Sequence, residues 1–328
     1  MVLLCMEIAK IRKGISVAEL PVPKRKSSAR IVFRALQKQL DLNASRNLLH
    51  SDAERLLDID ETFLAALEGL ATGSAGAISC DTIDRMAADA ATSFAARIQA
   101  LNQYIQIDRR ARESLKQIYV ETWRHLVQTG EVESSLRSYH FPKIKAFMEE
   151  IYPQTLAAGL RSATQLRRVP GNQYSAELQL RLLKLEPATA AVPFLDIGCG
   201  TDAILVRFLR SRSVLAYGID RSIKHKSDYL AEVDWFEYDY GHRKWGTVVS
   251  HLSLANHLVY AQRYDDAMVP RYLKTFTRVL DSISHGGTLT FAPAVELLES
   301  RVDKASFRID KWQIPPTAKV MRITRISP

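Results

Sequence analysis

The fold of this chain is decided by one stretch, Phe194-Leu-Asp-Ile-Gly-Cys-Gly-Thr-Asp202. The stretch predicts an apolar strand that runs into a glycine turn, and residues 203–212 predict a helix directly after it. Gly198 and Gly200 allow the backbone to turn sharply and to come close to a ligand, where a Cβ would clash. The helix presents free N–H groups and a positive dipole end to an anionic group at the turn.

A second apolar stretch, Val214-Leu-Ala-Tyr-Gly-Ile-Asp220, ends on a carboxylate that follows Gly200 by twenty residues. A carboxylate at the tip of the second strand can accept hydrogen bonds from both hydroxyls of a ribose. Together the two stretches predict a βαβ unit that binds an adenosine-type ligand. The glycine spacing, with Ala203 at the last glycine position, also suits a dinucleotide, so spacing alone leaves the ligand open.

The wording of residues 195–201 resembles motif I of the class I S-adenosylmethionine (SAM) dependent methyltransferases, whose usual form is Asp-x-Gly-x-Gly-x-Gly. The resemblance implies that SAM is the cosubstrate. The cofactor-binding residues that it implies here are Asp196, Gly198, Cys199, Gly200, Asp202, Asp220 and Arg221. Asp196 resembles the family acid near the methionine amino group. Asp202 departs from the family, because it replaces the third glycine and brings a carboxylate to the methionine end of SAM.

Strands and helices are predicted to alternate along residues 191–328, which indicates an α/β fold. The predicted strands cover residues 193–197, 214–219, 235–238, 247–252 and 288–292. A helix over residues 263–283, closed by Gly286-Gly287, is expected between the last two of these strands. Residues 306–312 and 319–325 alternate as two strands around a turn. A Rossmann-like class I methyltransferase sheet ends in such an antiparallel pair, and this is the fold that we expect.

The first half of the chain shows a different pattern. From about residue 30 to residue 160 the apolar spacing is helical, and no strand alternation is present. We therefore expect an all-helical cap or lid domain over residues 1–164 and a SAM-binding Rossmann-like domain over residues 165–328. The start of the chain, residues 1–6, is apolar but short and lacks a basic segment, so we do not expect a signal peptide.

Polar residues at the strand tips are the candidates for the site, because ligands of open α/β sheets lie beyond the carboxyl ends of the strands. At the third predicted tip the resemblance implies that Asp239 accepts from the adenine amino group and that Tyr240 packs on the ring. The fourth tip, residues 250–257, lacks the Asn-Pro-Pro-Tyr found in DNA and protein amide methyltransferases. The absence of this motif argues against methylation of the N6 amino group of adenine.

Four residues are candidates for catalysis, namely Tyr174, Ser253, Asn256 and His257. His257, or His251 in the cofactor site, could act as general base, because the pKa of histidine lies near neutrality. Tyr174 lies in the segment before motif I and could place its ring against the sulfonium. Each of these side chains could instead cap a helix or pack in the interior, and the sequence leaves both readings open.

The reaction also stays open at the level of sequence. The first hypothesis is methyl transfer to a small acceptor in secondary metabolism. The second is the chemistry of the azetidine-2-carboxylate synthases, in which the SAM α-amino group attacks the γ-carbon and releases methylthioadenosine. Asp202, the Ser253 and Asn256 pair and a large helical cap favour this cyclase. An RNA methyltransferase and an inactive SAM-binding protein are further alternatives.

Composition limits the class of partner. The fractions of hydrophobic (47%) and charged (25%) residues are those of a soluble globular protein, and no apolar run approaches the roughly 20 residues that span a membrane. The cysteines stand far apart, without metal or redox spacing, so we expect no metal ion. The net charge of +9 is spread along the chain, which argues against a nucleic acid partner. We expect a cytoplasmic enzyme with a small-molecule substrate, and the sequence does not fix its oligomeric state.

Overall fold

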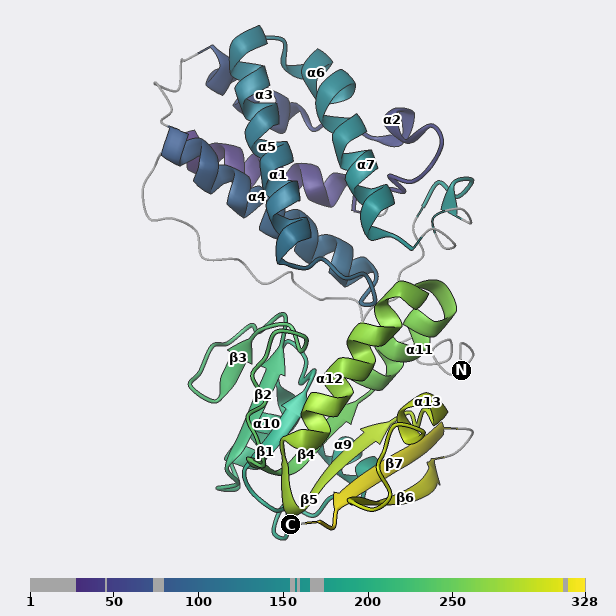
Figure 1. Cartoon of the computed structure of the whole chain (residues 1–328). Coiled ribbons are helices and arrows are strands. Elements are labelled where there is room, and N and C mark those ends of the chain that lie inside the picture. Colours follow the sequence, from purple (N-terminus) through teal and green to yellow (C-terminus); the bar gives the residue numbers. More distant parts are fainter. Residues whose placement is uncertain are drawn as a thin grey trace. The chain divides into compact units, whose positions relative to one another are not determined.

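The computed structural model describes residues 28–44, 46–72, 80–153, 157, 160–165, 174–314 and 318–327. The segment at residues 1–6 lies outside these ranges. The chain divides between residues 171 and 172 into a helical unit and an α/β unit (Figure 1). The division expected between residues 164 and 165 lies next to the undescribed residues 166–173 and stays a prediction.

The helical unit is built from helices, as its apolar spacing predicts. The helices are α1 (Ser28–Leu42), α2 (Ala53–Leu56), α3 (Glu61–Ala71), α4 (Cys80–Leu101), α5 (Arg109–Thr129), α6 (Val132–Ser135), the π-helical turn η1 (Leu136–His140) and α7 (Phe141–Ile151). Asp60 and Asp108 cap the starts of α3 and α5 by accepting main-chain N–H bonds, and Gly130 ends α5 with a φ of 70°.

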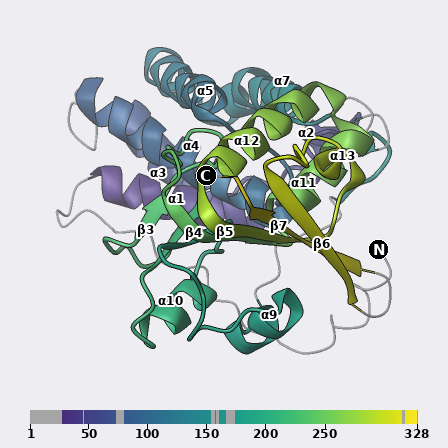
Figure 2. The ribbon, with the colours of Figure 1, turned by 60° about the horizontal axis from the view of Figure 1, so that its bottom comes forward.

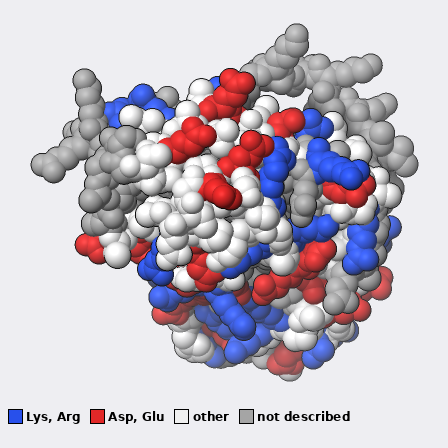
Figure 3. Space-filling model, turned by 90° about the horizontal axis from the view of Figure 1, so that it is seen from above, with Lys and Arg blue, Asp and Glu red and all other residues white. Residues whose placement is uncertain are grey.

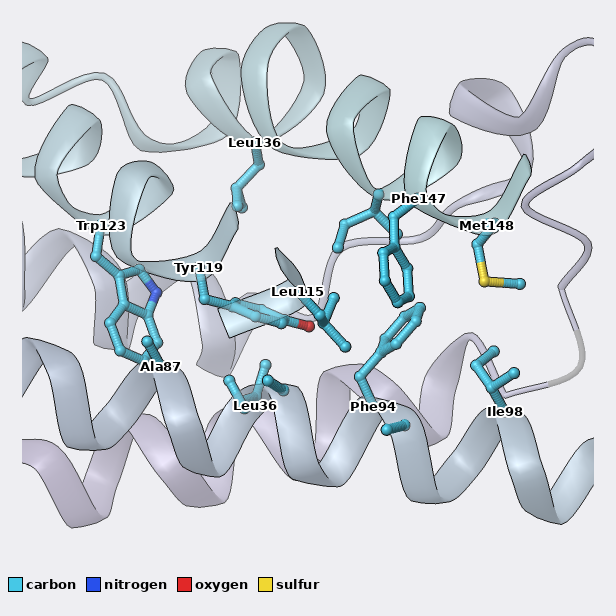
Figure 4. Close-up of a cluster of buried hydrophobic side chains, with 14 of the residues drawn as sticks. Leu36, Ala87, Phe94, Ile98, Leu115, Tyr119, Trp123, Leu136, Phe147 and Met148 are labelled. Carbon is cyan, nitrogen blue, oxygen red and sulfur yellow. The ribbon is translucent and has the colours of Figure 1, made fainter. Parts of the chain in front are cut away.

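Aromatic side chains hold the helical unit together. Phe94 of α4 and Phe147 of α7 meet edge to face, with ring centroids 6.5 Å apart (Figure 4). Tyr119 and Trp123 of α5 lie one turn apart and are buried in the same core. Large buried aromatic surfaces of this kind supply much of the burial energy of a small helical unit.

The α/β unit is a seven-stranded sheet with the order β3-β2-β1-β4-β5-β7-β6. The strands are β1 (Phe194–Ile197), β2 (Ala216–Asp220), β3 (Leu230–Glu232), β4 (Trp245–His251), β5 (Ile283–Ala292), β6 (Phe307–Ile314) and β7 (Ala318–Arg325). The first five pair in parallel, and β7 is antiparallel to β5 and β6. The predicted Rossmann-like sheet with a C-terminal antiparallel pair is confirmed.

Helices cover both faces of this sheet. They are α9 (Ala176–Leu183), α10 (Ile204–Arg210), α11 (Leu254–Tyr264), the 3₁₀ turn η2 (Asp266–Met268), α12 (Val269–Asp281) and α13 (Glu296–Glu299). Figure 2 shows α9 and α10 on one face and α11, α12 and α13 on the other, each over its own apolar core. The strand order reverses between β1 and β4, and ligands of open α/β sheets bind at such a switch point.

The third strand differs from the prediction. Residues 235–238 were expected as a strand, but β3 is Leu230–Glu232, and the predicted stretch forms turns. Asp234 causes this difference, since its side chain accepts from Phe236 N (2.9 Å) and its carbonyl accepts from Glu237 N (2.9 Å). A side chain that bonds its own backbone competes with a strand ladder, even in a stretch rich in aromatic residues.

The helix expected over residues 263–283 is also corrected. Two helices, α11 and α12, occupy residues 254–281, and Gly286-Gly287 lies inside β5 rather than after a helix. The register between β4 and β5 shifts at this point. A Cβ on Gly287 would lie 2.8 Å from Gly246 O, so the glycine permits a close approach of two strands.

Charged side chains of both signs are mixed on the surface (Figure 3). In the helical unit several basic residues pair with acids, among them Lys38 with Asp60 and Arg97 with Asp41. The face in view shows no single basic track of the kind that follows a phosphate backbone. Among the residues that the structure describes, no helix has the length and apolar character to cross a membrane.

Candidate functional site

The glycine turn follows β1, one of the two strands that flank the switch point, and contacts the end of β2. Gly198 and Gly200 have φ values of 74° and 78°, in the left-handed region that glycine adopts without strain. The N–H groups of Gly198 and Cys199 both donate to the carbonyl of Ile219, at 2.8 and 3.1 Å. The turn is therefore fixed to the end of β2.

Asp220 stands at the tip of β2, next to this turn. Its Oδ2 accepts from Gly200 N (2.9 Å), and its Oδ1 accepts from Ser222 N (3.0 Å). Burial raises the pKa of this carboxyl, and the two main-chain hydrogen bonds oppose the rise. A carboxylate offers about four lone-pair sites, so Asp220 keeps acceptor capacity beyond these main-chain bonds. The structure thus brings the turn and the carboxylate into direct contact.

Asp196 lies on β1, on the same face of the sheet as Asp220. The register pairs Asp196 with Gly218, two residues before Asp220. Burial, together with the charge of Asp220, raises the pKa of Asp196 to about 7. The Cys199 thiol is also buried, and burial with the two nearby carboxylates raises its pKa, so it stays protonated at neutral pH. Cys199 contributes its main-chain N–H to the turn rather than a reactive thiolate.

Asp202 and Arg221 flank these groups. Asp202 is partly exposed two residues before α10, and its carbonyl accepts from Arg207 Nε at 3.0 Å. Arg221 directly follows β2, and its charge opposes the burial that raises the pKa values of Asp220 and Asp234. Both predicted residues therefore belong to the same end of the sheet as the glycine turn.

The third strand tip corrects the predicted adenine contacts. Tyr240 is buried in the core and donates its hydroxyl to Trp235 O (2.9 Å), so its ring is not available to a ligand. Asp239 is exposed, and its side chain accepts from Gly241 N in a turn beyond the strand tip. The prediction was wrong because it depended on the misplaced third strand.

Asp234 and Trp235 occupy the third tip instead, and the sequence reasoning missed both. Val233 N donates to Asp220 O (2.9 Å), so Asp234, the next residue, lies beside the tip of β2. Burial raises the pKa of Asp234, against a main-chain bond from Phe236 and the Arg221 charge. Trp235 Cζ3 lies 3.4 Å from where a Cβ on Gly198 would stand. The Asp-Trp pair after a short strand was the signal that could have found them.

Ser253 has a contact other than the predicted catalytic one. Its hydroxyl is buried and donates to Ile197 O at the end of β1 (2.6 Å). Ser250 Oγ lies 2.7 Å away and also accepts from Leu254 N (3.2 Å). The Ser253 proton is thus occupied by a main-chain carbonyl, which removes Ser253 from the candidates for proton transfer. Ser250 was not predicted, because one serine in a run of polar residues carries no distinct signal.

His257 and Asn256 lie in the first turns of α11 rather than in a loop. His257 is buried edge to face against Trp235, with ring centroids 4.8 Å apart, and burial lowers its pKa well below the usual range. This environment contradicts its predicted role as general base, since the ring is packed under the third tip. Asn256 is partly exposed, and its Nδ2 donates weakly to Leu252 O (3.4 Å).

Tyr174 and His251 lie together in the structure. Tyr174 precedes α9, His251 ends β4, and their rings meet edge to face with centroids 5.2 Å apart. Burial lowers the pKa of His251 to about 4, so its imidazole is neutral at physiological pH. Of the two histidines that the sequence proposed as general bases, His251 is therefore the one that lies at the end of a strand and can accept a proton there. Within the described ranges, no group of three or more His, Cys, Asp or Glu could hold a metal ion.

Comparisons with known proteins give fold-level likenesses alone. No protein-family model matches the chain, and neither does any curated protein. The N-methyltransferase NodS from Bradyrhizobium japonicum WM9 is similar over 46% of this chain and 96% of its own, with 15% identity and a TM-score of 0.32. The structure of NodS in complex with S-adenosyl-l-homocysteine is similar over 46% of this chain and 87% of its own, with 14% identity and a TM-score of 0.35. The (4+2)-cyclase SpnF is similar over 47% of this chain and 80% of its own, with 13% identity and a TM-score of 0.34. Because each TM-score is below 0.5, the function has to be argued from the residues of the site.

Proposed function

We propose that the α/β unit binds SAM at the carboxyl ends of β1 to β4 and uses it for methyl transfer to a small molecule. One observation carries the proposal: the Asp220 carboxylate at the tip of β2 accepts from Gly200 N, at 2.9 Å, in the positive-φ turn after β1. This arrangement fixes a carboxylate next to the partly exposed main chain of the turn, beside the switch point of the sheet. A ribose diol fits it, because both hydroxyls can donate to the remaining acceptor sites.

The other strand tips fit the remaining parts of SAM. Asp234 keeps one carboxylate oxygen beyond its bond from Phe236 N, and that oxygen suits an adenine amino group. Trp235 Nε1 is buried without a hydrogen-bond partner among the described residues. An unpaired buried donor costs about 1–3 kcal/mol, so a ligand acceptor that reached it would be stabilised. Asp196 and Asp202 would lie toward the positively charged amino end.

The catalytic task of the chain is then mainly alignment. Bound SAM supplies an electrophilic methyl group, and an oriented acceptor needs little further activation. His251 can accept a proton from the acceptor, but a pKa of about 4 makes it a weak base at neutral pH. Tyr174, whose ring lies against His251, would steady the sulfonium by attraction to its face. The net charge of +9, spread along the sequence rather than clustered, favours a small acceptor over RNA.

Cyclisation of SAM to azetidine-2-carboxylate is the second candidate, and Asp202 is the observation that favours it. Asp202 is partly exposed beside the glycine turn, where the family has a glycine. The α-amino group would have to be deprotonated to attack the γ-carbon, and a carboxylate there could orient it. Ser253, which the sequence also placed in favour of this reaction, is committed to Ile197 O.

Mass spectrometry of the purified protein with SAM separates these reactions. Methyl transfer predicts no turnover with SAM alone, and S-adenosylhomocysteine once a panel of small acceptors is added. Cyclisation predicts methylthioadenosine and azetidine-2-carboxylate from SAM alone. Failure to bind SAM at micromolar concentration would contradict both, and the variant Asp239→Ala serves as a control that leaves the proposed site intact.

A further inference from the structure

A pair of buried serines joins the tip of β4 to the glycine turn. Ser253 Oγ donates to Ile197 O (2.6 Å), the last carbonyl before Gly198, and lies 2.7 Å from Ser250 Oγ. Both serines are buried. Ile197 ends β1, so this hydroxyl connects the fourth strand tip to the point where the backbone leaves the first strand.

Ser253 stands at the start of α11 without capping it. The Ser253 side chain accepts no main-chain N–H of the helix. Ser250 accepts from Leu254 N (3.2 Å) instead. A serine side chain that caps a helix stabilises it, and Ser253 does not supply this bond because its hydroxyl points to Ile197 O. The Ser253 hydroxyl therefore bonds the main chain that enters the glycine turn and not the N–H groups at the start of α11.

Packing at Gly198 makes the same connection. A Cβ on Gly198 would lie 2.9 Å from Ser253 Oγ and would collide with Ser253 Cβ. Its third neighbour would be Trp235 Cζ3, at 3.4 Å. Gly198 is therefore enclosed between the third and fourth tips, and Ser253 is the closest wall. A change in the Ser253 side chain would be felt directly at the turn that also carries the Gly200 bond to Asp220.

We propose that Ser253 is a positioning residue, oriented by Ser250, which fixes the glycine turn in the geometry that binds the adenosine part of SAM. Ser253 acts through Ile197 O and Gly198, and it does not touch the reacting atoms. The identity of the ligand rests on the proposed function, whereas the effect of Ser253 on the turn does not. The ligand-free protein therefore tests the second part separately.

The test combines hydrogen exchange at residues 194–203 of the ligand-free chain with the Kd for SAM. Ser253→Ala keeps the Cβ and removes the hydroxyl. Ser284→Ala is the matched control, since Ser284 Oγ of β5 donates to Trp245 O (3.0 Å) at the opposite end of β4. We expect Ser253→Ala to speed exchange in the turn and to weaken SAM binding roughly tenfold, the scale of one net hydrogen bond. Ser284→Ala should change neither.

Each other outcome has a defined meaning. Turn exchange in Ser253→Ala that matches the Ser284→Ala control would overturn the proposal. Faster exchange with unchanged SAM affinity would also overturn it, because the turn geometry would then not matter for the ligand. Faster exchange in a chain whose wild type binds no SAM would support the positioning of the turn and contradict the proposed function.

Discussion

Asp234 and Asp239 both follow the third strand, and we expect opposite effects on SAM binding when each is replaced. Asp234 sits at the strand tip with its pKa raised by burial, whereas Asp239 is exposed in a later turn. Asp234→Ala should weaken SAM binding about 10- to 100-fold, the scale of a charge-assisted hydrogen bond. Asp239→Ala should leave it unchanged. Isothermal titration calorimetry on both variants checks this, and the reverse ranking would restore Asp239 as the adenine contact.

The buried carboxyl of Asp196 makes the stability of the α/β unit depend on pH. Its folded pKa of about 7 lies above the usual 3.8, so the folded state holds a proton that the unfolded state releases between these values. Stability therefore falls as pH rises from about 4 to about 7, by up to about 4 kcal/mol. Asp196→Asn should remove this decline.

Calorimetric melting at about pH 5 and about pH 8 measures the Asp196 effect. The melting temperature of Asp196→Asn should exceed that of the wild type by more at the higher pH. Asp228→Asn, at an exposed position, is the control. An equal difference at both pH values would show that Asp196 is ionised throughout.

Among the elements, the irregular start of β5 depends on two adjacent glycines in different ways. A Cβ on Gly287 would meet main-chain oxygens at 2.8 and 2.9 Å, whereas Gly286 has open space but a φ of 72°. Gly287→Ala should destabilise the chain by about 1–3 kcal/mol through overpacking, and Gly286→Ala by about 1–2 kcal/mol through strain. Urea denaturation of the two variants gives the comparison. Little loss in Gly287→Ala would mean that the two strands can separate without cost.

The π-helical turn η1 carries a histidine inside the helical unit. His140 is buried, its Nδ1 lies 2.9 Å from Thr122 Oγ1, and it packs against Tyr119 and Phe141. Burial, with the charge of Lys143, lowers its pKa from 6.5 to about 4. The unfolded state binds the proton first, so stability is full above about pH 6.5 and falls toward pH 4, by about 3 kcal/mol.

His140→Asn should therefore flatten the acid loss of the helical unit between about pH 6.5 and pH 4. The decrease in helical circular dichroism on acidification measures it. The same change at His125, which is half-exposed and stacks on Tyr139, is the matched control. An acid transition that is unaltered in His140→Asn would assign the transition to other groups.

The elements that the sequence missed are those in which a local polar contact overrode the pattern. Apolar alternation located six of the seven strands, but Asp234 turned the aromatic stretch after β3 into a turn. The glycine pair that suggested a helix end serves a register shift between strands. Helix ends such as Gly130 were predictable, because glycine readily adopts the left-handed conformation that ends a helix.

At the scale of the whole molecule, periodicity indicated a helical half and an α/β half, and the glycine turn with Asp220 indicated where to expect the site. The sequence could not rank the polar residues of the fourth tip. His251, Ser253 and His257 stand within seven residues, yet one meets Tyr174, one bonds Ile197 O and one is buried against Trp235. Those differences depend on contacts with distant elements. A lid role for the helical unit stays a prediction.

The central claim is that Asp220 and the glycine turn form a SAM site, and equilibrium binding to the full chain tests it most directly. The wild type should bind SAM and S-adenosylhomocysteine at micromolar concentration, in preference to NAD. Asp220→Ala should weaken SAM binding at least about tenfold, since it removes the acceptor for Gly200 N and for the ribose. Unchanged affinity in Asp220→Ala, or preferential binding of NAD, would contradict the account.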